Sequence, residues 1–217
     1  MKMLTAVTAD VMNRLAPDAG VVMYDVDLSA VADAAAAAAL IETYRADPEH
    51  WIGVTDGGIK INEGRSTWSP TFDGKRMPFK GDKFLDTAEP TIGFTLLEYI
   101  PENVVLASGA ADKSGSGGHI KVTPRASYKD EDYKSNVVFM TMVGSDGIYC
   151  AELKNALCTK GLDMTTADKA VGKLAVEFMG HKDDPKSLDT LPIDYHFFGA
   201  TGAAAASEQG EQPAAAE

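Results

Sequence analysis

The sequence predicts a mainly β protein: a β-sandwich or β-barrel with a short flanking α-helix, an extended amino-terminal arm and a long loop. Short segments of alternating apolar and polar residues recur from residue 51 onward, and this alternation is the pattern of half-buried strands. Turn residues separate the segments, and only two stretches have the composition of a helix. Hydrophobic residues make up 45% of the 217 residues, which is enough to fill a core.

Residues 1–50 are expected to form the amino-terminal arm, with a possible Ala-rich helix. Val21–Tyr24 has the composition of a short strand. A helix is predicted from Ser29, a suitable N-cap, to Arg45, through six consecutive alanines. Alanine buries little area, so this helix is expected to be marginal alone or to order against a partner.

The β domain is expected to span residues 51–200. A strand ending at Ile61 precedes a polar stretch, residues 62–90, which is rich in turn residues and is predicted to be a long hairpin or loop that projects from the core. Thr91–Tyr99 is a strong strand candidate, because its apolar residues alternate. A short helix is predicted to begin at Pro101 and to end near Gly109.

The second half of the chain contains the most apolar segment, Asn136–Gly144. Both of its faces are apolar, so this strand is expected to be covered on both sides. Asp146-Gly147 is a hairpin signal. Ser114–Gly118 is interpreted as a flexible connector and not as a phosphate loop, because no helix follows it. The further strands are predicted at residues 148–151, 156–162, 171–179 and 193–198.

The chain is acidic, with 20 Lys and Arg, 32 Asp and Glu, and a net charge of −12. This charge argues against a protein that grips nucleic acid through its phosphates. Residues 201–217 hold three glutamates and no base and are expected to be a disordered tail, which leaves a net charge of −9 on the remainder. No membrane span or secretory signal is predicted, because the long apolar runs of both are missing.

No catalytic, cofactor-binding or metal site is predicted. The four histidines lie in separate segments, although a three-histidine site assembled by folding remains open. Asp25 and Asp27 share one strand face and are interpreted as an acidic surface. Cys150 and Cys158 have neither redox nor zinc spacing and are expected to be reduced and packed, although pairing across a hairpin is an alternative.

The candidate contacts between subunits are mostly aromatic side chains of the polar stretch, since aromatic residues commonly anchor protein interfaces. Trp51 and three aromatics of that stretch could instead stack on sugars, which would indicate a carbohydrate-binding or adhesin-like module. The candidate inter-subunit contacts are Trp68, Phe72, Phe79, Lys80, Phe84 and Tyr24.

The order of these features resembles the major tail proteins, or tail tube proteins, of long-tailed bacteriophages. The resemblance covers about residues 51–199 and rests on element order and turn placement. The Ala-rich segment before Trp51 and the acidic tail after Gly199 depart from the family pattern. The features that carry it are the Gly57-Gly58 turn, the loop with Asp73-Gly74 and Lys80-Gly81, the strand Thr91–Tyr99, the helix after Pro101, the β meander and the closing segment Pro192–Phe197.

The resemblance implies a virion structural protein with a tail-tube-like β-sandwich and no enzymatic activity. Six copies of such proteins close into a ring through edge-to-edge strand pairing, and the rings stack into a tube that conducts the genome into the host. Implied partners are further copies of the chain, a tape-measure protein, a tail terminator and a distal tail protein. The implied location is the virion tail, assembled in the bacterial cytoplasm, with DNA passing through the lumen without specific binding.

Within this class, the tube of a contractile tail or injection system shares the fold and remains an alternative to a non-contractile tail. The acid excess suits a conduit for DNA, because carboxylates that line a lumen repel phosphates and leave a path of low friction. The long loop and the amino-terminal arm are expected to order on assembly and to contact adjacent rings.

Overall fold

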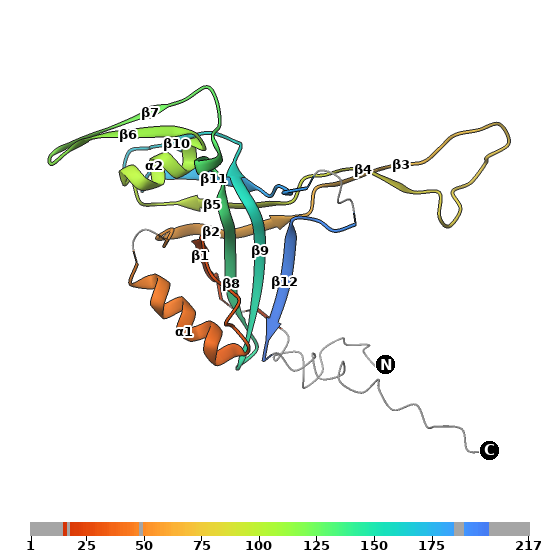
Figure 1. The fold of residues 1–217 in the computed structure, drawn as a ribbon, viewed down its shortest axis with the longest axis horizontal. Coiled ribbons are helices and arrows are strands. Elements are labelled where there is room, and N and C mark those ends of the chain that lie inside the picture. The colour runs from red at the N-terminus through yellow and green to blue at the C-terminus, as the bar shows by residue number, and fades with distance from the viewer. Residues whose placement is uncertain (1–14, 17, 48–49, 185–188, 200–217) are drawn as a thin grey trace, which may run out of the picture.

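A computed structural model describes residues 15–16, 18–47, 50–184 and 189–199. The fold is mainly β with antiparallel sheets and two α-helices, which confirms the predicted class (Figure 1). The expected acidic tail, residues 201–217, lies outside the described residues. The elements are β1 (Val21–Tyr24), α1 (Ala34–Arg45), β2 (Thr55–Asn62), β3 (Arg65–Trp68), β4 (Phe84–Ala88), β5 (Thr91–Leu96), α2 (Pro101–Ser108), β6 (Ala111–Ser116), β7 (His119–Pro124), the 3-10 helix Asp130–Asp132, β8 (Lys134–Val143), β9 (Gly147–Cys158), β10 (Asp163–Thr165), β11 (Lys173–Met179) and β12 (Ile193–Phe198).

Two sheets share the strand β9. Sheet I has the order β1-β8-β9-β12. Sheet II contains β2, β5, β11 and β10, and the last residues of β9 pair with the end of β11. The long strands β8 and β9 meet at the hairpin that Asp146-Gly147 predicts. The first described strand, β1, is therefore an edge strand of a sheet built mostly from the second half of the sequence.

A kink at Asn155 lets β9 serve both sheets. The residue has a φ of +45°, and this left-handed conformation reverses the usual alternation of side chains. Leu153 before the kink and Ala156 after it both face the core between the sheets. The prediction of two separate strands at residues 148–151 and 156–162 is therefore wrong, because the chain bends here without leaving the sheet.

The main core fills the space between the two sheets. Its largest fully buried side chains include Phe178 and Leu174 of β11, Leu96 of β5 and Leu153 of β9. Leu106 and Ala107 of α2 close one end of this core. As predicted, α2 begins at Pro101, and its C-cap Gly109 has a φ of +73°.

A second core lies on the other face of sheet I, where α1 packs against it. Val138 and Met140 of β8 point toward α1, whereas Val137 and Phe139 point toward sheet II. This arrangement confirms that β8 is covered on both faces. Ala37 of α1 is completely buried, so the alanines let the helix axis approach the sheet closely.

Two local predictions are wrong. The helix α1 begins at Ala34 and not at Ser29, because Asp33 is the N-cap and its carboxylate accepts a hydrogen bond from Ala36 N at 2.8 Å. The glycine-rich segment 114–118 is not a flexible connector, because it forms the end of the β6–β7 hairpin. Gly115 permits a close approach of the two strands, because a Cβ there would lie 2.4 Å from His119 O.

Both described ends of the chain lie at the same end of sheet I. Leu15 O accepts a hydrogen bond from Gly144 N in the β8–β9 turn. Gly199 lies beside Ala34 and Asp146. Among the described residues, no helix has the length and apolar character that spanning a membrane requires.

Replacing the cap, Asp33→Ala, should lower the free energy of unfolding by about 1 kcal/mol, because the N–H of Ala36 loses its acceptor. Urea denaturation followed by circular dichroism measures this change. Ser29→Ala is the matched control and should have little effect. Equal losses in the two variants would contradict the placement of the cap.

Gly109→Ala should destabilise the protein by about 1–2 kcal/mol from the left-handed conformation alone. A Cβ at this position would also lie 2.0 Å from Cys158 O, so the contact between α2 and β9 would have to open. Gly118→Ala is the control, because its Cβ would meet open space. An unchanged midpoint of thermal unfolding in Gly109→Ala would contradict this packing.

Candidate assembly surface

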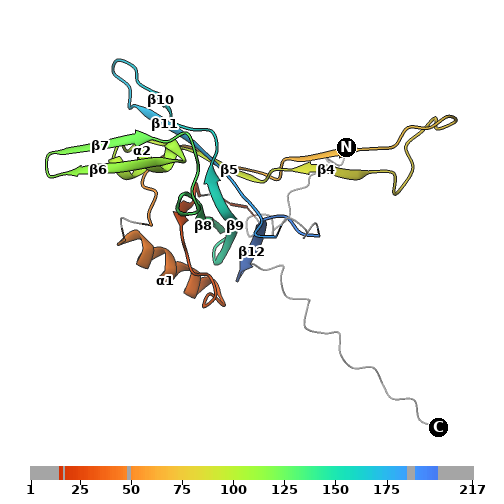
Figure 2. The same ribbon diagram turned by 45° about the horizontal axis from the view of Figure 1, so that its top comes forward.

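A long hairpin projects from the body and carries most of the candidate contact residues. Its stem is the two-stranded ladder of β3 and β4, and its tip is the connection, residues 69–83; we call residues 62–90 the projecting hairpin. Figures 1 and 2 both show it extending away from the two sheets. Gly64 permits the close approach at its base, because a Cβ there would lie 2.3 Å from Glu89 O.

The stem exposes a stacked aromatic pair. Trp68 and Phe84 lie opposite each other in the ladder, with ring centroids 5.3 Å apart and a 28° angle between the planes. About half of the Trp68 surface is still exposed (51%). The large exposed apolar residues of the projecting hairpin are Trp68, Phe72, Met77, Phe79, Phe84 and Leu85. Apolar side chains gathered on one protruding element are typical of an interaction surface.

The tip is held together by one charged side chain. Lys75 Nζ lies 5.9 Å and 5.2 Å from the ring centroids of Phe72 and Phe79, so both rings make cation–π contacts with it. The same nitrogen donates to Pro70 O at 2.8 Å and forms an ion pair with Asp82 Oδ2 at 2.7 Å. The tip therefore has a defined shape although it lies outside both cores.

Asp82 is the buried member of this pair, with 2% of its surface exposed. The hydrogen bond from Lys75 lowers the pKa of the Asp82 carboxyl below its ordinary value, and a bond from Phe79 N at 3.3 Å adds to this. The carboxylate is thus charged at neutral pH and closes the tip. Neither Lys75 nor Asp82 is among the predicted contacts. The sequence indicates an ordered tip only through two turn signals in one polar loop, Asp73-Gly74 and Lys80-Gly81.

Lys80 is exposed at the tip, as are most of its neighbours. Residues 70–84 contain the four bases Lys75, Arg76, Lys80 and Lys83, and the two acids Asp73 and Asp82. The tip is therefore basic although the protein as a whole carries −12. Opposite charges on two parts of one surface favour the approach of a second copy.

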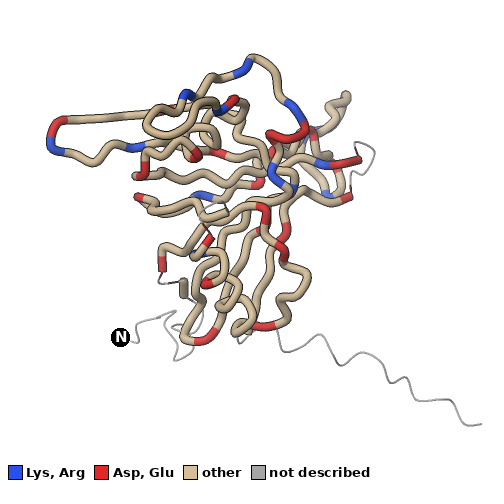
Figure 3. The backbone as a smooth tube through the Cα atoms, turned by 60° about the vertical axis from the view of Figure 1, so that its left-hand side comes forward, with Lys and Arg blue, Asp and Glu red and all other residues tan. Residues whose placement is uncertain are grey.

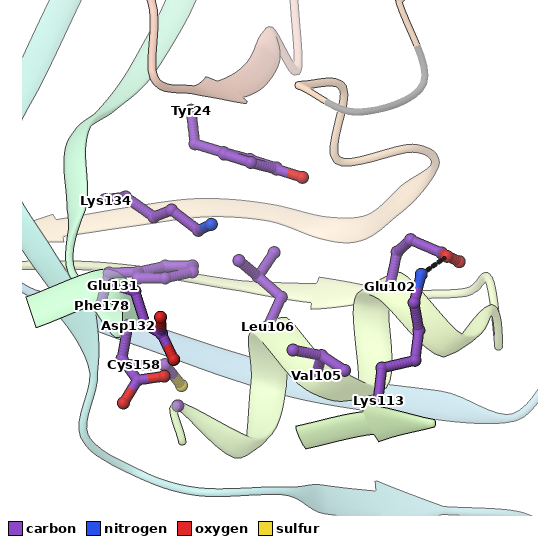
Figure 4. Close-up of a pocket in the computed structure, with 11 residues that line it drawn as sticks. Tyr24, Glu102, Val105, Leu106, Lys113, Glu131, Asp132, Lys134, Cys158 and Phe178 are labelled. Atoms are coloured by element: carbon purple, nitrogen blue, oxygen red, sulfur yellow. Dashed lines mark hydrogen bonds and ion pairs between the residues drawn. The ribbon is translucent and has the colours of Figure 1, made fainter. Parts of the chain in front are cut away.

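Tyr24 is not part of this surface. It lies on β1 and lines a cavity of about 200 Å³ at the end of the main core (Figure 4). Lys134 Nζ lies 4.9 Å from the centroid of the Tyr24 ring. The structure thus brings Trp68 together with Phe84, and Phe72 together with Phe79, but places Tyr24 elsewhere.

The floor of the cavity is apolar and its rim is charged. Figure 4 shows Val105 and Leu106 of α2 at the floor and the ion pair between Lys113 and Glu102 at the rim, with an N–O distance of 2.7 Å. Cys158 also lines the cavity, but burial raises the pKa of its thiol, and Sγ donates to Ala107 O. Such a thiol is a poor nucleophile, so the cavity offers no activated cysteine for covalent chemistry.

Three strands at sheet edges are open in the described part of the chain, the short β10 beside β11 and the longer β12 and β2. β12 pairs with β9 on one side, and β2 pairs with β5 on one side; no described strand covers the other side of either. β1 is different, because on its outer side Tyr24 N donates to His50 O and Ile52 N donates to Val22 O. Open edges present unpaired backbone groups and are places where a further strand can add.

The cysteines and histidines are dispersed. Cys150 and Cys158 are free and buried on one strand, eight positions apart, so they do not face each other across a hairpin. Burial raises the pKa of Cys150 to about 12. The described histidines do not meet one another; His196 instead lies beside Glu152 and Asp194, a grouping that sequence reasoning missed. Its only signal was the Asp-x-His spacing on a strand.

Charge is unevenly distributed over the body. Figure 3 shows acidic and basic residues intermixed around the upper part of the molecule, whereas the lower part, where the described chain ends lie, is chiefly acidic. Asp146 is in the β8–β9 turn of this lower part, and Asp33 precedes Ala34, which packs beside Gly199.

No protein-family model matches the chain, and no curated protein matches it. The function must therefore be inferred from the residues and the geometry.

Lys75→Gln should raise the pKa of Asp82 toward its ordinary value, because the hydrogen bond that lowers it is lost. A lowered carboxyl pKa stabilises the folded tip above the unfolded-state value of about 3.9. This stabilisation is lost as the pH falls through the folded value. Carboxyl ¹³C NMR titration measures the shift, with Lys80→Gln as the control. An unchanged Asp82 titration in Lys75→Gln would rule out the pair.

Proposed function

We propose that this protein is a structural subunit of a tail tube of the long-tailed bacteriophage type. In this proposal six copies form a ring, and stacked rings form a channel through which the genome passes into the host cell. The proposal places the protein in the virion tail, with the tape-measure, terminator and distal tail proteins as partners. It includes no enzymatic activity.

The single observation that carries the proposal is the projecting hairpin. It has an ordered tip and a row of exposed aromatic and aliphatic side chains, yet in the described structure it lies outside both cores. Exposed apolar area is unfavourable in water, so a protruding element that carries it is typical of a surface that a partner covers. Contact with a neighbouring copy would bury it.

The open edges support ring formation. If β12 or β2 of one copy adds to a sheet of the next copy, the sheets join into one continuous barrel. Closure of the ring then pairs the edges that join the copies, which limits aggregation through them. The projecting hairpin remains available for contact between rings.

The charge distribution agrees with contact between copies and with the passage of DNA. A basic tip on an acidic protein favours heterologous contact, in which the tip of one copy meets the body of another. Removal of the three glutamates in residues 201–217 leaves a net charge of −9 on the rest of the chain. An acidic lumen would let DNA pass without binding.

Electron microscopy of the concentrated protein tests the proposal: stacked rings with an axial channel are expected. Double replacement of the stem pair, Trp68→Ser with Phe84→Ser, should prevent the hexameric rings from stacking into tubes, because it removes the largest exposed apolar surface of the stem. The variant should keep the unfolding midpoint of the wild type, since neither ring belongs to a core. Tyr128→Ser, which removes another exposed aromatic of the body, is the matched control.

A wild-type protein that stays monomeric at every concentration, alone and with tail partners, would overturn the proposal. Saturable binding of an oligosaccharide that is lost in the Trp68 variant would favour the carbohydrate-binding alternative instead. Tubes that assemble only together with a contractile sheath would assign the protein to a contractile system.

A further inference from the structure

Three side chains that commonly bind metals meet on the α1-facing side of sheet I, where β12 pairs with β9. Asp194 lies directly opposite Glu152 in the ladder, and His196 follows two residues later on the same face. One ligand atom from each residue lies within 4.8 Å of the other two. The side chains of Glu152, Asp194 and His196 are 16%, 46% and 35% exposed, so the cluster lies close to the surface.

The imidazole of His196 leaves one nitrogen without a hydrogen bond. Nε2 is buried and has no hydrogen-bond partner in the described part of the chain. It lies 3.5 Å from Glu152 Oε2, but the geometry is not that of a hydrogen bond. Two ligands of one tetrahedral zinc ion with bonds of about 2.0 Å are about 3.3 Å apart. The observed separation is thus close to that of a coordinated pair.

Glu152 is held in position by a buried amide. Its Oε1 accepts a hydrogen bond from Asn136 Nδ2 at 2.8 Å. Asn136 is itself fixed by bonds to both the N–H and the carbonyl of Val26, each 2.8 Å long. This leaves Oε2 directed at His196. Partners that orient a ligand from behind are a general feature of metal sites.

We propose that Glu152, Asp194 and His196 bind one divalent transition-metal ion, with Zn²⁺ as the best fit, and that this ion ties β12 to β9. One imidazole and two carboxylates suit Zn²⁺, Mn²⁺ or Co²⁺, whereas Mg²⁺ and Ca²⁺ prefer oxygen ligands alone. Water completes the coordination. The ion competes with Lys154, whose Nζ lies 2.5 Å from Asp194 Oδ2.

Isothermal titration of the full-length protein with Zn²⁺ tests the site, and one ion per chain is expected. His196→Ala and Glu152→Gln should each weaken binding about tenfold or more. Lys154→Met should tighten it, because a competing cation is removed. His119→Ala, which removes an exposed imidazole on β7, is the control and should bind as the wild type does. Hydrogen exchange of the β12 amides should slow when Zn²⁺ is added.

Absence of saturable binding by the wild type would overturn the site, as would equal affinity in the wild type and His196→Ala. Asp194→Asn keeps the side-chain shape and serves as a second variant if His196→Ala unfolds, which circular dichroism will reveal; unchanged affinity in Asp194→Asn would also contradict the proposal. The site lies within one chain, so unassembled protein suffices. The outcome is therefore independent of whether tubes form.

Discussion

The sharing of β9 between two sheets is the constraint on which the rest of the fold depends. Its first residues pair with β8 and β12, and its last two pair with β11. The left-handed Asn155 lets apolar residues before and after it face one core. Without this kink the alternation of side chains would direct Ala156 away from the core, and the two sheets would not enclose a common interior.

The two cores differ in how they are closed. Sheet II and α2 close the main core with large aliphatic and aromatic side chains, whereas α1 closes the second core with two alanines, Ala34 and Ala37, and three larger side chains, Leu40, Ile41 and Tyr44. The position of α1 depends on this packing against β8 and β9 and on the capping bond of Asp33. The projecting hairpin, by contrast, has no core, and its tip depends on the ion pair between Lys75 and Asp82.

Local patterns predicted β1, β5, β8, β12 and α2 well, because their alternation, composition and capping residues act within a few positions. Local patterns do not predict where a strand bends, or which residues the register of two paired strands brings together. The kink at Asn155 has no glycine or proline to mark it, so the local pattern predicts two strands where β9 is continuous. The grouping of Glu152, Asp194 and His196 depends on a strand pairing across more than 40 positions, which no local pattern specifies. Trp68 and Phe84 lie opposite each other because the β3–β4 hairpin pairs them. Tyr24, which is predicted from residue type alone, lies at the cavity instead.

The chain has only two tryptophans, and the fold separates them. Trp51 bridges to Met23 beside the second core and lies under the Arg45 guanidinium, 5.6 Å from its ring centroid. Trp68 is half exposed on the stem of the projecting hairpin. The intrinsic fluorescence of the protein therefore divides into two reporters: one responds to unfolding of the body, and the other responds to whatever covers the hairpin. A change of environment at the hairpin can thus be followed spectroscopically while the body stays folded.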